Sequence, residues 1–131
     1  MQAPCDAILL RIFIGHDDAY RDKPLYEEIV REARTADMAG ATVTRGLLAF
    51  GPGSQKYGIL LRLSEDLPIV IEIVDTVEKI HRFLPIVDGM ISSGLVTTQP
   101  ISVFRCGPST EKPRWLVALA RGCHERRTPA D

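Results

Sequence analysis

The residues that decide the fold are Leu61-Arg62-Leu63-Ser64-Glu65-Asp66-Leu67-Pro68 followed by Ile69-Val70-Ile71-Glu72-Ile73-Val74-Asp75. The second half predicts a largely buried strand, because β-branched residues fill almost every position and suit a pleated, packed surface. Glu72 interrupts the apolar run, and a carboxylate in such a strand needs a partner for its charge. Glu72 is therefore either half of an internal ion pair or part of a binding site.

Three more strands are predicted from apolar residues. Alternation predicts a strand over residues 7–15, and apolar runs bounded by turn residues predict strands over 41–50 and 95–105. Gly46, inside the second of these, predicts a bulge or a close approach of two backbone segments. Pro100 removes a hydrogen bond from the last strand, so this strand should lie at a sheet edge.

Two helices are predicted from apolar residues at helical spacing. The first begins at Pro24 and ends at Gly40. The second follows a capping Thr76, ends at Gly94 and contains Pro85, which should kink it or break it in two. The residues expected to face the core are Leu25, Ile29 and Ala33 in the first helix, and Val77, Ile80, Leu84, Val87 and Ile91 in the second.

The order of these elements is β-α-β-β-α-β. With right-handed crossovers this order gives an α+β, ferredoxin-like sandwich, in which one antiparallel sheet carries both helices on one face. Its usual strand order places the second and fourth strands at the edges, in agreement with the position of Pro100.

The sheet face without helices carries apolar residues and one pair of opposite charges. Arg11 and Glu72 lie on neighbouring central strands of this face and are placed to pair across the ladder. A patch of large apolar residues on an open face is rarely left exposed by a soluble monomer, so we expect oligomerisation through this face. The apolar residues are Leu9, Phe13, Val70 and Val74.

Length and charge limit the classes of function. The 131 residues predict one domain over 1–106, followed by a tail over 107–131 that forms a short helix and is then disordered. A net charge of −1 gives no electrostatic footprint for nucleic acid or for an anionic membrane. The apolar runs are too short to span a bilayer and no secretory signal is visible, so we expect a cytoplasmic protein without membrane insertion.

Cysteine and histidine patterns predict neither a disulfide framework nor a metal site. Cys5, Cys106 and Cys123 form an odd set without CxxC spacing, and we expect three reduced thiols. The group His16-Asp17-Asp18 is expected to be a solvated turn, because metal ligation takes three or four convergent side chains.

Four blocks of sequence together resemble the DUF190 family of PII-like proteins. They are Leu10-Arg11-Ile12-Phe13-Ile14-Gly15; Lys23-Pro24-Leu25-Tyr26-Glu27; Gly40-Ala41-Thr42-Val43-Thr44-Arg45-Gly46 with Phe50-Gly51; and the opening stretch from Leu61 to Asp75. Phe83-Leu84-Pro85 and Gly94-Leu95-Val96-Thr97 continue the resemblance, which covers residues 7 to 105. It implies a homotrimer that regulates an unidentified protein partner, such as a membrane transporter, and that binds an adenine nucleotide in the clefts between subunits.

The resemblance also implies which residues do this. The ligand-binding residues would be Thr42, Phe50, Gly51, Glu72, Ile73, Val74 and Arg105, with the third strand supplying backbone groups and Arg105 facing phosphate. The mobile loop that contacts the partner would comprise Gly53, Ser54, Gln55, Lys56, Tyr57 and Gly58. The candidate ligands are AMP, ADP, ATP and cyclic AMP. PII proteins have a longer phosphate loop where this chain has Ser92-Ser93-Gly94, and this difference argues against a triphosphate in particular.

Two other functions are compatible with the same residues. A small oligomeric enzyme would use Lys56 or Tyr57 as an acid–base group in the same cleft. A ligand-free interaction module would need no cleft at all. Arg105 is either a ligand contact or an exposed charge at a strand end, and Glu65-Asp66 are expected to be polar turn residues because adjacent side chains diverge.

Overall fold

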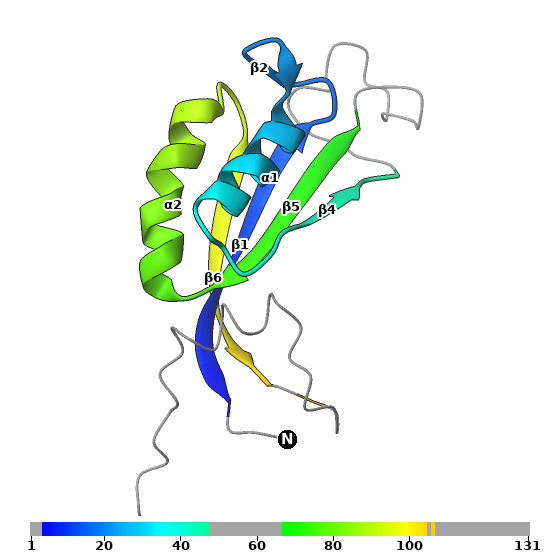
Figure 1. Ribbon diagram of the computed structural model, residues 1–131. Helices are drawn as coiled ribbons and strands as arrows, with labels where there is room; N and C mark the ends of the chain where they lie inside the picture. Colours follow the sequence, from blue (N-terminus) through cyan, green and yellow to red (C-terminus); the bar gives the residue numbers. More distant parts are fainter. Residues whose placement is uncertain (1–3, 48–66, 105, 107–131) are drawn as a thin grey trace, which may run out of the picture.

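The computed structural model describes residues 4–47, 67–104 and 106, which form a helical layer packed on a sheet (Figure 1). In chain order the elements are β1 (Cys5–Gly15), β2 (Ala19–Tyr20), β3 (Lys23–Pro24), α1 (Leu25–Thr35), β4 (Thr42–Arg45), β5 (Pro68–Asp75), α2 (Val77–Met90) and β6 (Leu95–Val103). β2 and β3 form a small hairpin of their own, and the other four strands form one sheet in the order β4-β5-β1-β6. All neighbouring strands are antiparallel, so the predicted ferredoxin-like βαββαβ sandwich is confirmed.

The two edges of the sheet are those predicted. β4 and β6 occupy them, and Pro100 of β6 lies opposite Ile8 of β1. Because β6 has a neighbour on one side only, the missing N–H of Pro100 is tolerated there.

The core lies between the sheet and the helices. β1 and β5 each turn alternate residues toward the helices, and α1 contributes the three residues predicted for its buried face. Burying an aliphatic side chain of this size contributes about 1.5–3 kcal/mol, so this layer supplies most of the driving force for folding. Its central residues are Leu10, Ile12, Ile14, Leu25, Ile29, Ala33, Ile69, Ile71, Ile73, Ile80, Phe83 and Val87.

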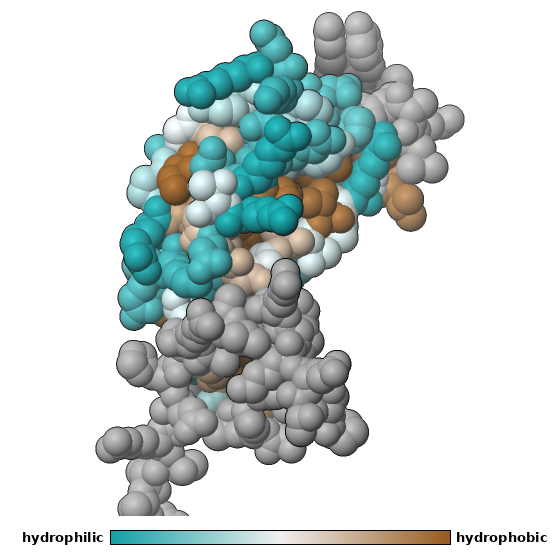
Figure 2. Space-filling model, viewed as in Figure 1, coloured by the Kyte–Doolittle hydropathy of each residue, from teal (hydrophilic) through white to brown (hydrophobic). Residues whose placement is uncertain are grey.

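The opposite surface of the helical layer faces water. Figure 2 shows hydrophilic side chains over the helices, with smaller apolar areas between them. This distribution agrees with the amphipathic pattern of α1, whose buried residues recur every four positions.

α1 ends well before Gly40, so the predicted end is wrong. Asp37 has a left-handed backbone with φ of 57°, its N–H donates to the carbonyl of Arg34 at 3.1 Å, and the N–H of Met38 donates to the carbonyl of Ala33 at 3.0 Å. These two bonds form a Schellman motif, which closes many helices. The left-handed position usually holds glycine, and for this reason the sequence pointed to Gly40 instead.

α2 is a single helix that contains Pro85 and ends at Met90, rather than two pieces or one helix reaching Gly94. Pro85 and His81 are both exposed, so the position of the hydrogen bond that the proline lacks is on the solvent-facing side of the helix. Gly94 has a different role, because a Cβ there would lie 3.0 Å from the carbonyl oxygen of Phe13. It allows the chain to pass closely over β1.

The buried face of α2 differs from the predicted one at its start. Val77 is 40% exposed, whereas Phe83 is 1% exposed and Met90 is also buried. The buried positions are Ile80, Phe83, Val87 and Met90. The predicted Leu84 and Ile91 are partly buried and pack against the same core, so Val77 is the predicted residue that the structure places outside it.

The segment between β1 and α1 contains the β2–β3 hairpin. Arg21 and Asp22 at its tip have positive φ values of 50° and 64°. Two consecutive left-handed residues are typical of a tight hairpin turn of type I′, which normally favours Asn-Gly. The sequence signal was absent because neither preferred residue is present.

Gly46 marks a close approach of two backbone segments, as predicted. Its N–H donates to the carbonyl of Pro68 at 2.9 Å, and a Cβ at Gly46 would lie 2.9 Å from the Pro68 ring. β4 ends at Arg45, directly before this contact. The part of the predicted strand over 48–50 lies outside the described residues, as does the predicted tail.

Candidate functional site

The sheet face without helices has the composition that the sequence predicted. Leu9 and Phe13 of β1 lie opposite Val74 and Val70 of β5, and all four are partly exposed. The residues that alternate with them, Leu10, Ile12 and Ile14 in β1 and Ile69, Ile71 and Ile73 in β5, are buried under the helices. The face is therefore a partly exposed apolar surface.

Arg11 and Glu72 pair across this face, as predicted. The two residues are opposite each other on β1 and β5, and Arg11 Nε lies 3.2 Å from Glu72 Oε1. Each side chain is 41% exposed, so solvent screens the interaction. Arg11 thus offsets the charge of the Glu72 carboxylate, which lines the pocket described next.

A pocket of about 490 Å³ lies at one end of this face. One wall is the segment that joins α1 to β4, the floor comes from β5, and the other wall comes from the end of β6. This volume is in the range of small-molecule sites. The lining residues are Ala39, Gly40, Ala41, Thr42, Glu72, Val74, Ile101, Ser102 and Val103.

The pocket brings together three of the predicted ligand-binding residues. Thr42 lies opposite Glu72 in the β4–β5 ladder, and Val74 follows on the same side of β5. Ile73 points to the other side, is 0% exposed and packs in the core. Its side chain therefore does not reach the pocket, which leaves its backbone as the group that the prediction assigned to it.

The remaining predicted residues lie outside the described part of the chain. These are the ligand-binding Phe50, Gly51 and Arg105 and the partner loop with Gly53, Ser54, Gln55, Lys56, Tyr57 and Gly58.

Two groups of pocket residues were not predicted from the sequence. Ala39, Gly40 and Ala41 form a wall of small residues, but Gly40 was interpreted as the end of a helix. Ile101 and Val103 reach the pocket because β6 pairs with β1 along Cys5–Phe13. The register of β6 against β1 would have indicated that these two residues reach the pocket. Ile101 and Val103, apolar residues at alternate positions near the end of β6, are consistent with that register.

The pocket is mainly apolar. Among its lining residues in the described ranges, Glu72 is the one that carries a charge, and this charge faces Arg11. Small and aliphatic residues favour a flat, uncharged group, and the carboxylate accepts hydrogen bonds from hydroxyl or amino groups. This chemistry fits a nucleoside rather than a phosphate group.

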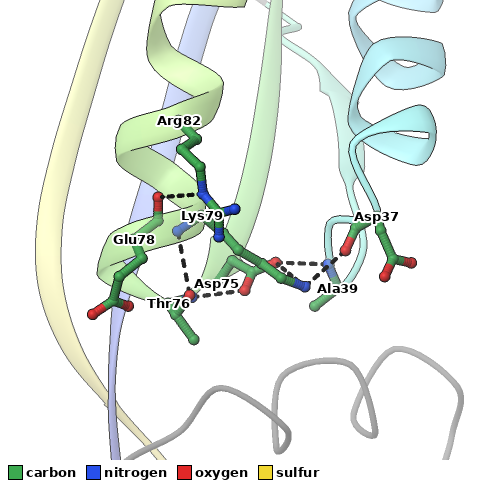
Figure 3. Close-up of polar contacts among 7 residues, drawn as sticks. All are labelled: Asp37, Ala39, Asp75, Thr76, Glu78, Lys79 and Arg82. Atoms are coloured by element: carbon green, nitrogen blue, oxygen red, sulfur yellow. Dashed lines mark hydrogen bonds and ion pairs between the residues drawn. The ribbon is translucent and has the colours of Figure 1, made fainter.

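The wall of small residues is held from behind by a buried carboxylate. Asp75, the last residue of β5, is 0% exposed and accepts a hydrogen bond from the N–H of Ala39 at 2.8 Å (Figure 3). Its other oxygen accepts from the N–H of Thr76 at 2.7 Å. Thr76 in turn caps α2 by accepting from the N–H of Lys79 at 3.3 Å, which confirms the predicted cap.

The described residues show no cluster of three or more side chains that could hold a metal ion. The side chains of His16 and Asp17 contact each other at 3.1 Å, and a carboxylate oxygen of Asp18 accepts from the N–H of Gly15 at 2.8 Å. The carboxylate of Asp18 thus shapes the turn that follows β1. In the same ranges, no helix is long and apolar enough to cross a membrane.

The expectation of three reduced thiols is wrong for Cys5. This residue, at the start of β1, forms a disulfide whose partner lies outside the described residues. Cys106 is free and exposed. The sequence contains no CxxC spacing that would have indicated this bond.

Solved structures with the same fold as this chain include PII-like proteins. A PII-like signalling protein from Thermus thermophilus superposes with a TM-score of 0.57 at 18% identity, covering 78% of this chain and 93% of that chain. CPII from Thiomonas intermedia K12, a nitrogen regulatory PII-like protein bound to ADP, AMP and bicarbonate, superposes with a TM-score of 0.55 at 19% identity, covering 78% and 92%. At these identities the likeness establishes a PII-like fold.

Sequence relatives and a family model identify the family of this chain. A UPF0166 protein from Aquifex aeolicus is 36% identical over 96 residues, which is 72% of this chain and 90% of the relative. The model of the DUF190 family, described as "Uncharacterized ACR, COG1993", matches residues 7–103. The chain therefore belongs to the DUF190 family.

Proposed function

We propose that this protein is a PII-like regulator that binds an adenine nucleotide in the pocket on the open sheet face. The observation that carries the proposal is the meeting of Thr42, Glu72 and Val74 in a mainly apolar pocket of about 490 Å³. CPII, which has the same fold, is bound to ADP and AMP. The fold is thus compatible with such ligands.

The nucleoside occupies the pocket and the phosphate groups extend beyond it. The aliphatic side chains Val74, Ile101 and Val103 pack against the base, while Glu72 and Thr42 bond to polar groups of the nucleoside. The phosphates require cationic or N–H donors, and Arg105 is the proposed cationic contact because a guanidinium binds phosphate oxygens bidentately.

The regulator works as a homotrimer, and a neighbouring subunit closes the pocket. Every residue of β4 is exposed, and Leu95 and Val96 of β6 are 60% and 36% exposed. Exposed edges and a partly exposed apolar face are typical of chains that assemble. The loop over 51–58 contacts a protein partner in the cytoplasm. The nucleotide binds the different conformations of this loop with different affinities, and nucleotide binding therefore changes the affinity of the regulator for its partner.

Calorimetric titration with AMP, ADP, ATP and cyclic AMP, with and without magnesium, tests this function. Thr42→Phe fills the pocket from β4, whereas Thr44→Phe adds the same side chain to the same exposed strand outside the pocket. We expect saturable binding without turnover for the wild type and for Thr44→Phe, and loss of binding for Thr42→Phe.

Three results would count against the proposal. Equal nucleotide affinity of the two variants would mean that the nucleotide does not bind in this pocket. Turnover of a nucleotide that is lost when Lys56 and Tyr57 are changed would make the protein an enzyme. Absence of binding to every nucleotide, together with recovery of a protein partner, would make it an interaction module.

A further inference from the structure

We propose that Asp75 is a positioning residue that holds the Ala39–Thr42 wall of the pocket at the distance a ligand requires. The part of this inference that concerns ligand affinity rests on the proposed function. The part that concerns the wall rests on the contacts of Asp75 alone.

Asp75 links the end of β5 and the start of α2, which follow each other directly in the chain, to the segment after α1, which lies 36 residues earlier. It ends β5, its Oδ2 accepts from the N–H of Ala39 at 2.8 Å after α1, and its Oδ1 accepts from the N–H of Thr76 at 2.7 Å at the start of α2. Figure 3 shows the carboxylate between these segments. Hydrogen bonds to an ionised carboxylate are stronger than neutral ones, so a single side chain fixes all three.

The charge of Asp75 is offset from two sides. Lys79 Nζ lies 3.9 Å from Asp75 Oδ2 and donates a hydrogen bond to the carbonyl of Asp37 at 2.8 Å. The N-terminus of α2 also favours a negative charge. An aliphatic side chain would fill a buried site at lower desolvation cost, and therefore the carboxylate is there for its hydrogen bonds.

The link from Asp75 to the pocket is short. Val74 lines the floor of the pocket, and the next side chain, Asp75, points to the opposite side of the strand and reaches Ala39 around its end. The wall is thus fixed at one end by Ala39 and at the other by Thr42, which pairs with Glu72. Gly40 and Ala41, between them, have no long side chain to anchor them.

The test compares Asp75→Asn with Val87→Ala. An amide keeps the size of the side chain, but its NH₂ group cannot accept and its one oxygen is uncharged, so one of the two hydrogen bonds is lost and the other is weakened. Val87, which is 1% exposed on α2 and does not line the pocket, provides a destabilised control. The measurements are hydrogen exchange at the N–H of Ala39, relative to that of Ile12 in β1, and calorimetric titration with ADP.

For Asp75→Asn we expect relative exchange at Ala39 to rise at least about tenfold, and ADP affinity to fall at least about tenfold. Val87→Ala should leave both within about twofold, because it weakens the core without touching the wall. Equal changes in the two variants would overturn the positioning role, since loss of stability alone would then explain them. Unchanged exchange at Ala39 in Asp75→Asn would also overturn it.

A second variant covers the case in which Asp75→Asn does not fold. Lys79→Gln keeps the carboxylate and removes its cation and the ammonium bond to Asp37. We expect a several-fold rise in exchange at Ala39, and no rise would overturn the proposal. If the wild type binds none of AMP, ADP, ATP and cyclic AMP, the nucleotide function fails and ligand affinity cannot depend on Asp75. The exchange result still decides whether Asp75 holds the wall.

Discussion

Arg11 and Glu72 lie opposite each other on the two central strands, with Arg11 Nε 3.2 Å from Glu72 Oε1, on the sheet face that carries no helix. The sequence left open whether Glu72, an acid within an apolar strand, is half of an ion pair or part of a binding site, and this contact shows that Glu72 is half of an ion pair. Because Glu72 also lines the pocket, it serves as an ion-pair partner and as a pocket residue.

This ion pair should contribute little to stability. Each side chain is 41% exposed, so we expect a double-mutant cycle with Arg11→Gln and Glu72→Gln to give a coupling energy of about 0.2–1 kcal/mol. Urea unfolding of the four proteins measures it. A coupling above about 2 kcal/mol would mean that the pair is buried in solution, as it would be inside an oligomer.

Two glycines should respond in opposite ways to alanine. At Gly46 a Cβ would meet the Pro68 ring at 2.9 Å, so we expect Gly46→Ala to destabilise the protein by about 1–3 kcal/mol. Gly89, in α2, has no atom within 4 Å of the added Cβ, so Gly89→Ala should stabilise by about 0.5–1 kcal/mol. Thermal unfolding of both variants checks the signs, and a stabilising Gly46→Ala would show that Pro68 moves aside.

Asp37 occupies a position that glycine would suit better. Its φ is 57° at the end of α1, and its backbone carbonyl accepts from Lys79 Nζ in a contact that any residue can make. Asp37→Gly should therefore raise stability by about 1 kcal/mol, whereas Asp37→Ala should not, because alanine keeps the Cβ that disfavours this conformation. Equal effects of the two changes in chemical unfolding would contradict the assigned backbone conformation.

The local pattern of residues predicted the fold well where a single periodicity dominated. Alternation along β1 and β5 predicted both faces of the sheet, and Leu25, Ile29 and Ala33 predicted the buried face of α1. Element ends were harder to predict because they depend on backbone hydrogen bonds. Asp37 adopts a left-handed backbone conformation that an aspartate in the sequence does not indicate, and for that reason the predicted end of α1 was wrong.

The candidate site was predictable only in part for a similar reason. Thr42, Glu72 and Val74 were identified through the family resemblance, and their strands pair directly. Ala39 and Asp75 are 36 residues apart and meet through a side chain that reaches around the end of a strand. No periodicity encodes such a contact, so the role of Asp75 required the structure.

Mutations in α2 test whether its buried face is the one in the structure or the one predicted from the spacing of apolar residues. Phe83 is 1% exposed and Val77 is 40% exposed, although the spacing of apolar residues placed Val77 in the core. We expect Phe83→Ala to cost about 3–5 kcal/mol and Val77→Ala less than about 1 kcal/mol, as measured by urea unfolding. A large effect at Val77 would restore the face predicted from the sequence.

The open sheet face should mediate assembly. Phe13 is partly exposed on this face, next to other apolar side chains, whereas Ile86 is 38% exposed on α2 in the helical layer. We expect the wild type to sediment as a trimer and Phe13→Glu to dissociate it, because burying an unpaired carboxylate in an apolar interface is strongly unfavourable. Ile86→Glu should leave the trimer intact. If Ile86→Glu dissociates the assembly and Phe13→Glu does not, the subunits meet through the helices, and the pocket on the open face is not closed by a neighbour.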